Sequence, residues 1–470
     1  MKNSILILFL FSLLFTACGS NNTSQTTTES VSEELNQTKE RNETEEIQEN
    51  LITEEPILLK DPLFQKFYTG FGTALTFPFL SKQNRQLDIE LNSLLLDENI
   101  KENTLYQEIK NINISAFEKL QTKLKQSKFL VFWLTEEWEE EWFNKEKIQE
   151  LMDADYIPVF SYWYFGDKLI YGIPNKDKIA LYKKNNIKLA NFLSQLNGKK
   201  MLIMEPEFNK SEIVKDIKTQ EELTIILSEA IDTIREKNSK ELLISISIMD
   251  KGMRGVNNHH VGCGYDNCSL GDNTTWANSE TVINGLIDKV DFISFHQMIG
   301  SFSRDYENLG TWNQPNPRTY KDDEIGIDYL GTRILNLTTF LHQKYKKPVF
   351  MPFISIATAT WEDENSNQKI ETTEVNYNDW EDKATYIYSE LQELKPLLKE
   401  NGLFGFAIMS LFDNPRQDYE GYQYFMNNEY HLGIIGSGAK DEVDIASDGN
   451  LYFKGEILEY LFNNNNENKE

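Results

Sequence analysis

The sequence is poor in cysteine, histidine and positive charge. Its 470 residues include three cysteines and five histidines, and 47 Lys and Arg face 74 Asp and Glu, which gives a formal net charge of −27. This negative balance disfavours binding to nucleic acid and docking on anionic lipid, because both carry charge of the same sign. The GxSxG, HExxH and Walker-loop motifs are also missing, so the sequence predicts no nucleophile elbow, zincin or P-loop.

A long apolar run is missing too. The run at 5–15 follows Lys2 and is too short to cross a bilayer, which takes roughly 20 residues. It leads into Phe15-Thr16-Ala17-Cys18-Gly19, which resembles the lipobox of bacterial lipoproteins, with Phe15 in place of the usual Leu. The resemblance implies a signal peptide over 1–17, a lipid on Cys18 and anchoring to the cell envelope through that lipid only. An ordinary secretory peptide cleaved elsewhere is the alternative.

The segment after this signal is polar and acidic. Residues 18–60 are rich in Ser, Thr, Asn, Gln and Glu and show no helical or strand period, which predicts a flexible linker. In an exported protein the two remaining cysteines, Cys263 and Cys268, are expected to form a local disulfide. A metal site formed by these two cysteines with His259 and His260 is the alternative, but we expect no metal and no cofactor.

From about residue 61 the composition becomes that of a folded domain, which we place at 61–465. Eight apolar, β-prone runs follow one another, at 67–76, 129–134, 157–164, 201–205, 242–248, 290–295, 348–356 and 403–411. Amphipathic helical patterns lie between them, at 114–126, 177–196, 220–237, 279–287, 328–345 and 381–400. This alternation predicts an α/β fold, a (β/α)8 TIM barrel with long loops at its C-terminal face. An open doubly wound sheet competes, but Gly70-Phe71-Gly72 matches a GxGxxG loop poorly.

The fourth apolar run ends in two carboxylates, Glu205 and Glu207, separated by Pro206. If the chain stays extended past the proline, both side chains point to one side, roughly 6 to 7 Å apart. Two acids at the end of a buried strand are costly to place unless they are used. Active sites of such barrels lie at the carboxyl ends of the strands, so both are candidate catalytic residues. A solvated strand-to-helix turn is the alternative.

Other strand ends and long loops add acids and aromatic rings. Candidates for a second carboxylate are Asp250, Asp363 and Asp413. Candidates for substrate binding are Tyr162, Trp163, Trp276, His296, Trp361 and Asn414. Aromatic faces stack on sugar rings and carboxylates bind hydroxyl groups, so this combination suits a neutral carbohydrate. The loops at 251–278 and 300–324 are expected to wall the site.

The same residues resemble a known group of enzymes, the TIM-barrel glycoside hydrolases of clan A. Met204-Glu205-Pro206 is similar to their Asn-Glu-Pro without the Asn, and Pro206-Glu207-Phe208-Asn209 is similar to the His-Glu-x-Asn of β-mannanases without the His. The resemblance spans about 64–462, with a last helix at 453–462, and implies an acid/base Glu at the end of the fourth strand. The two motif matches assign the acid/base role to different residues, the first to Glu205 and the second to Glu207.

The seventh strand departs from this group. Lys347-Pro348-Val349-Phe350 matches the run that leads to the group's nucleophilic Glu, but Phe353 or Ser355 stands where that Glu is expected. Three routes remain open. An inverting mechanism would pair Glu205 or Glu207 with the other Glu, Asp250 or Asp413, at a separation of roughly 6.5–9.5 Å. Alternatively, Asp363 acts as nucleophile, or the barrel binds glycan without cleaving it.

The sequence therefore predicts a lipid-anchored glycoside hydrolase acting on a neutral polysaccharide or oligosaccharide. We expect a monomer on the outer membrane or cell surface, with carbohydrate as its partner and no nucleic acid. A catalytically inactive glycan-binding barrel is the first alternative. A lipid-tethered solute-binding protein is the second, and it predicts two lobes in place of one barrel.

Overall fold

The structure is a computed structural model. It describes residues 61–72, 126–140, 143, 145–238, 241–250, 274, 276–299, 330–356, 358, 360–361, 375–376, 378–412, 432–437, 451–454, 456–457 and 460. The predicted signal peptide, linker, nearly all of helix 114–126 and all three cysteines lie outside these residues, so those parts of the domain division stay predictions. No helix within the described ranges is both long and apolar enough to cross a bilayer.

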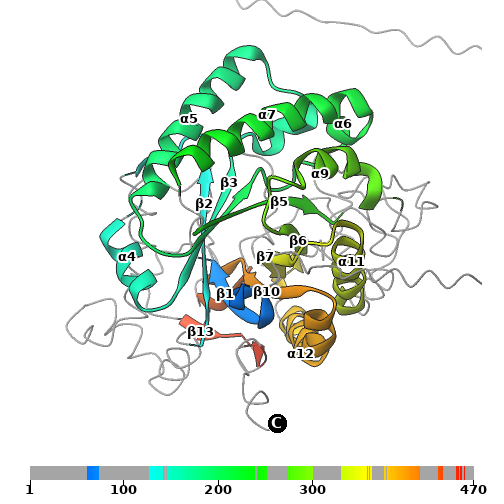
Figure 1. Cartoon of the computed structure of the whole chain (residues 1–470). Helices are drawn as coiled ribbons and strands as arrows, with labels where there is room; N and C mark the ends of the chain where they lie inside the picture. Colours follow the sequence, from blue (N-terminus) through cyan, green and yellow to red (C-terminus); the bar gives the residue numbers. More distant parts are fainter. Residues whose placement is uncertain are drawn as a thin grey trace, which may run out of the picture. The chain divides into compact units, whose positions relative to one another are not determined.

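Eight parallel strands close into one barrel (Figure 1). They are β1 (Tyr68–Gly72), β2 (Phe129–Thr135), β3 (Ile157–Trp163), β4 (Lys200–Met204), β5 (Leu242–Met249), β6 (Ile293–Ile299), β7 (Val349–Ile356) and β10 (Leu403–Ile408). The ring closes because β1 pairs in parallel with both β2 and β10. The predicted (β/α)8 fold is confirmed, and the described residues form neither an open doubly wound sheet nor two lobes.

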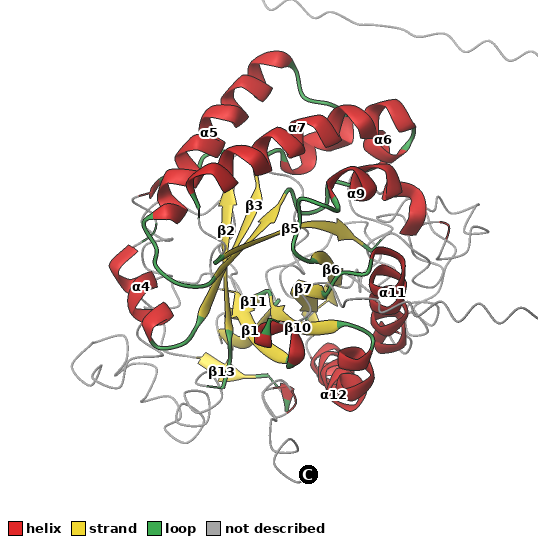
Figure 2. Ribbon diagram, in the orientation of Figure 1, coloured by secondary structure: helices red, strands yellow, loops and turns green. Residues whose placement is uncertain are grey.

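Helices lie outside the ring of strands (Figure 2). They are α4 (Lys145–Asp153), α5 (Lys176–Ser194), α6 (Ser211–Val214), α7 (Ile217–Lys237), α9 (Glu280–Leu286), α11 (Leu330–Tyr345) and α12 (Asn378–Glu400). Helices α5, α7, α9, α11 and α12 were predicted, whereas α4 and α6 were not. Side-chain caps fix two of the starts, because Asn175 accepts from the Lys178 N–H and Asp216 from the Thr219 N–H.

The shorter elements correct two predicted boundaries. The eighth predicted strand ends at Ile408, and β11 (Ser410–Phe412) then joins β12 (Gly433–Ser437) and β13 (Leu451–Phe453) in a small separate sheet. Phe453, predicted to open the last helix, lies in β13 because it pairs with Ile435 of β12. A two-stranded sheet joins β8 (Thr360–Trp361) and β9 (Val375–Asn376). Short 3-10 helices complete the described elements: η2 (Pro62–Gln65), η5 (Gly166–Tyr171) and η7 (Ala277–Ser279).

Packed aromatic rings fill the amino-terminal end of the barrel. Phe350 and Phe404 stack at 5.1 Å, and Phe129 and Phe292 meet them edge-on. Phe64, which the structure places in η2 before the first strand, packs edge-on against Phe404 at 4.9 Å. Burying each phenyl side chain contributes roughly 1.5–3 kcal/mol. This end is therefore a filled core, and polar chemistry is left to the opposite end of the barrel, where the strands finish.

Candidate active site at the carboxyl ends of the strands

The chain turns sharply where β4 ends. Glu205 and Glu207 both have left-handed backbones, with φ of 42° and 66°. The expectation of an extended chain past Pro206 is therefore wrong, and the two carboxylates enter different surroundings. A left-handed backbone costs roughly 1–2 kcal/mol for a residue with a side chain. Backbone hydrogen bonds hold it here, from Glu205 N–H to Tyr162 O at 2.9 Å and from Glu207 N–H to Ser247 O at 3.0 Å.

Glu207 lies at the barrel mouth, by which we mean the carboxyl ends of the strands. Its Oε2 is 2.5 Å from Lys210 Nζ, and its Oε1 is 3.1 Å from His296 Nε2. Lys210 Nζ also lies 2.7 Å from Asp167 Oδ1, at the start of η5. The side chain of Glu207 keeps 12% of its surface exposed. One cation thus ties two strand ends together and leaves Glu207 reachable from the mouth.

The charges in this cluster stabilise one another. Burial would raise the pKa of Glu207, but the Lys210 ammonium and His296 hold it well below its ordinary value. Burial would lower the pKa of Lys210, but Glu207 and Asp167 raise it above its ordinary range. Glu207 is accordingly an ionised carboxylate at neutral pH.

His296 on β6 is fully buried against this carboxylate. An ionised carboxylate only accepts hydrogen bonds, so Nε2 of His296 carries the proton that Glu207 receives. Nδ1 lies 3.5 Å from Ser247 Oγ, and the ring stacks on Phe353 of β7 at 4.2 Å. The ring is therefore fixed in orientation on one face and at both nitrogens.

Glu205 is in a different environment, under α5 and away from solvent. Its Oε2 accepts from the Phe165 N–H at 3.0 Å, and the rings of Tyr162, Tyr164 and Tyr182 surround it. Among the described residues no hydrogen-bond partner reaches its Oε1. Burial raises the pKa of Glu205 to about 8, a rise that the Phe165 N–H, the Tyr182 hydroxyl and the Tyr164 backbone only partly offset. Glu205 is thus a neutral carboxylic acid at pH 7.

Asp250, directly after β5, is enclosed by donors. Arg333 of α11 binds both oxygens, with Nε 2.6 Å from Oδ2 and Nη2 2.7 Å from Oδ1. Trp276 Nε1 donates to Oδ1 at 2.9 Å, and Gln297 donates to Oδ2. A carboxylate offers about four lone pairs, and all four are used. The geometry makes Asp250 a structural anion that ties α11 and η7 to β5 and β6.

The aromatic candidates divide between the inside and the outside of the barrel. Trp163 points inward and meets Trp133 edge-on at 6.0 Å, while Trp133 packs on Phe353 at 5.2 Å. Tyr162 points outward, is fully buried and stacks on Tyr182 of α5. Trp276 also lies outside the strands, on Phe340 of α11.

Of the remaining candidates, only the backbone of Trp361 is described, and it belongs to β8. Asp363, Asp413 and Asn414 lie outside the described residues, as do Cys18, Cys263 and Cys268. Their predicted roles stay predictions.

Sequence reasoning missed two cations that decide this site. Lys210 follows the predicted Glu-x-Asn segment and lies three residues after Glu207, a spacing that could have suggested the pair. Arg333 lies 83 residues after Asp250, and no sequence signal joins them. Asn209 was predicted only as part of a motif. Its Nδ2 donates to Met249 O at 2.8 Å and its Oδ1 accepts from Met249 N–H at 2.9 Å, so it fastens the β4 turn to the end of β5.

Possible metal ligands were compared across the barrel as well. In the described part of the chain, no three His, Cys, Asp or Glu side chains are grouped to hold a metal ion.

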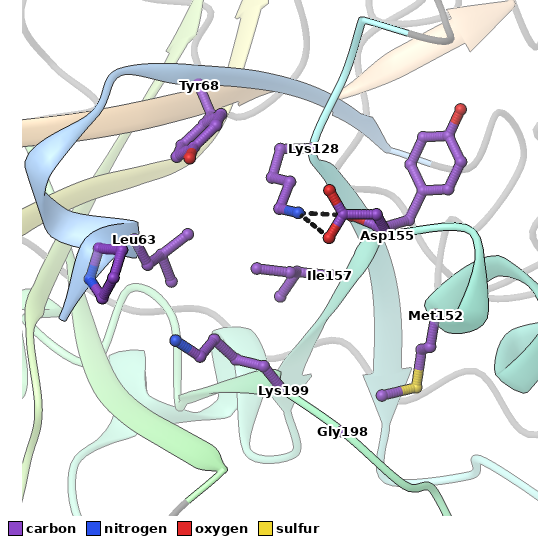
Figure 3. A pocket seen from close by; sticks show the side chains of 10 residues that line it. Leu63, Tyr68, Lys128, Met152, Asp155, Ile157, Gly198 and Lys199 are labelled. Atoms are coloured by element: carbon purple, nitrogen blue, oxygen red, sulfur yellow. Dashed lines mark hydrogen bonds and ion pairs between the residues drawn. The ribbon is translucent and has the colours of Figure 1, made fainter.

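A cavity of about 260 Å³ lies at the opposite, amino-terminal end of the strands (Figure 3). Its two lysines are already paired, Lys128 with Asp155 and Lys199 with Asp61. Barrel active sites lie at the carboxyl ends, so we assign the candidate site to the mouth.

Comparisons with known proteins give a distant structural likeness only. No family model and no curated protein sequence matches the chain. Solved structures that resemble it include a family 1 β-glucosidase from Thermotoga maritima, at 12% identity and a TM-score of 0.45, covering 84% of this chain and 96% of that one. A GH1 β-glucosidase from Exiguobacterium antarcticum gives the same values. A GH5_18 protein from Bifidobacterium longum matches at 10% identity and a TM-score of 0.40, covering 79% and 75%. Likeness at this level carries no argument about the site.

Proposed function

We propose that this protein is a glycoside hydrolase in which Glu207 is the working carboxylate at the barrel mouth. The observation that carries the proposal is the Glu207 cluster. An ionised carboxylate, partly exposed, is held on a strained turn by Lys210 and oriented by a buried histidine. Backbone strain of this kind clusters at functional sites.

The charge state of Glu207 favours the role of base over that of acid. Glu207 would take a proton from water as the water oxygen attacks the anomeric carbon, while the glycosidic C–O bond breaks and a second acid protonates the leaving oxygen. Asp363 and Asp413, which follow β7 and β10 in sequence, remain the candidates for that acid. Asp250 is unsuited to it, because its lone pairs are all engaged.

The substrate we propose is a neutral glycan. Trp133 and Trp163 bring indole rings into the barrel interior, and aromatic rings of this kind pack against the apolar faces of sugars. The net charge of −27 disfavours an anionic chain. We also propose that Cys18 is lipidated, so that Cys18→Ser would move the protein from the membrane fraction to the soluble one.

The test is to assay the parent protein and Glu207→Gln on a panel of neutral β-glycans. We expect the parent to release reducing ends and Glu207→Gln to lose about 1,000-fold in kcat or more, since it removes the base. Glu212→Gln is a matched control, because Glu212 is a half-exposed partner of Lys215 on α6, and it should keep full activity. A parent without turnover, or an active Glu207→Gln, would reject the assignment.

One observation favours a second candidate, a glycan-binding protein without turnover. Phe353 or Ser355 occupies the β7 position where the resemblance implies a nucleophile, and Phe353 packs on His296 and Trp133. Glycan-array binding by the parent, retained by Glu207→Gln and accompanied by no cleavage over days, would favour binding alone.

A further inference from the structure

We propose that Glu205 is a positioning residue for Glu207. Its uncharged carboxyl group holds the turn that joins the two residues, and the turn is released when this carboxyl group ionises. The part of this proposal that concerns turnover rests on the function proposed above. The part that concerns the turn itself does not.

The first support is the shape of the turn. Glu205 and Glu207 are both left-handed, one on each side of Pro206. Such a turn persists only where its surroundings hold it. The backbone hydrogen bonds of both glutamates contribute to this, and a side-chain bond joins the turn to the β3 loop, because Glu205 Oε2 accepts from the Phe165 N–H at 3.0 Å. The side chain of Glu205 therefore anchors the segment that places Glu207.

The second support is the chemistry of the enclosure. The groups that face Glu205 are Tyr162 of β3, Tyr164 and the Phe165 N–H of the following loop, and Tyr182 of α5. All three tyrosines are neutral at physiological pH, since burial raises the pKa of each. In the described part of the chain no Lys, Arg or His forms an ion pair with Glu205. A charge here would be buried without compensation, which strongly favours the neutral acid.

The third support is the contrast with Glu207, two residues further on. Glu207 has a lysine and a histidine, whereas the groups beside Glu205 are neutral, among them the Phe165 N–H and the Tyr182 hydroxyl. If Glu205 lost its proton, the cheapest relief would be to rotate the turn and expose the carboxylate. That rotation would draw Glu207 away from Lys210 and His296. The proton on Glu205 and the position of Glu207 are therefore coupled through one strained turn.

The test begins with Glu205→Gln, in which the amide keeps the shape of the neutral acid. Folded Glu205 holds a proton that the unfolded chain releases near its ordinary pKa of 4.5, so its contribution to stability is complete below that pH. The contribution is lost as pH rises to about 8, the pKa in the folded state. We expect urea denaturation between pH 5 and 8 to show the parent losing stability with a slope of about one proton relative to Glu205→Gln.

The control is Glu207→Gln, which should keep this slope, because the pKa of Glu207 is lowered and its own contribution changes only in acid. If the free energy of unfolding falls equally with pH in the parent and in Glu205→Gln, then Glu205 is ionised in the folded protein and the proposal is wrong. Should Glu205→Gln fail to fold, Tyr182→Phe serves in its place. It removes a hydroxyl that lowers the pKa of Glu205, so the window of declining stability should extend to higher pH, and an unchanged window would overturn the proposal.

Two readouts test the coupling to Glu207. The ring nitrogen signals of His296, assigned by their loss in His296→Asn, should shift between pH 7 and 9 in the parent and stay constant in Glu205→Gln. The second readout is the kcat on a glycan that the parent cleaves. At pH 7 the kcat of Glu205→Gln should stay within about tenfold of that of the parent, and it should not show the fall near pH 8 that we expect for the parent. A folded Glu205→Gln that loses 1,000-fold would make Glu205 a proton donor in the reaction, against the proposal. A parent that cleaves nothing rejects the proposed function but leaves the stability and His296 comparisons decisive.

Discussion

Two anions at the ends of neighbouring strands can be compared directly: Glu207 after β4 and Asp250 after β5. Each pairs with a cation that follows it in the chain, Lys210 or Arg333. Asp250 is fully buried, and four donors use its four lone pairs. Glu207 keeps 12% of its side-chain surface exposed and meets two donors among the described residues. The same chemical group is thus fully engaged in one place and partly available in the other.

This difference separates a structural carboxylate from a reactive one. A bidentate arginine with two further donors leaves no lone pair for water or substrate. A single lysine and an imidazole keep a carboxylate ionised and leave two lone pairs for a reactant. The number of donors therefore distinguishes the two carboxylates: four reach Asp250, and two reach Glu207 among the described residues.

The largest effect is expected from breaking the Asp250 cluster. Arg333→Ala removes the bidentate partner of a fully buried carboxylate and should lower the free energy of unfolding by about 3–5 kcal/mol, measured by urea denaturation. The double variant with Asp250→Ala should recover part of that loss, because it removes that carboxylate. Equal stability of parent and Arg333→Ala would show that this pair does not hold α11 to the barrel.

A smaller effect is expected from Lys210→Met. His296 still contacts Glu207, which is partly exposed, so we expect a loss of about 1–3 kcal/mol at pH 7. The lowered pKa of Glu207 contributes stability that is present above pH 4.5 and lost as pH falls below it. Lys210→Met should therefore lose less stability than the parent on going from pH 7 to pH 3. The control is Lys215→Met, an exposed lysine directly after α6, which should leave the stability nearly unchanged because an exposed ion pair contributes little. A parent and variant with the same acid dependence would contradict the pairing.

The smallest effect is expected from Asn209→Ala, which removes both hydrogen bonds to the Met249 backbone. At about 1 kcal/mol each, the loss should be about 1–2 kcal/mol. Asn209→Asp keeps the acceptor and loses the donor, so its stability should fall between parent and Ala. A stability of Asn209→Asp equal to that of the parent would show that the Nδ2 bond contributes nothing.

The sequence predicted the barrel well because strand periodicity is a local property. The runs at 129–134, 157–164 and 348–356 fall within one residue of β2, β3 and β7. Glu207 was also found locally, as an acid at the end of a buried strand. The direction of its side chain was not predicted, because the left-handed backbone at Glu205 and Glu207 depends on hydrogen bonds to Tyr162 and Ser247.

The sequence by itself determined eight strands, their order along the chain and the strand end that carries the two glutamates, since each depends on apolar runs a few residues long. Only the tertiary structure decided the protonation of those glutamates. It buried Glu205 beside Tyr182 of α5 and put Glu207 next to Lys210 and against His296 of β6, so that one is neutral and the other ionised. Charge depends on which groups surround a carboxylate in space, and most of these groups lie far from it in the chain.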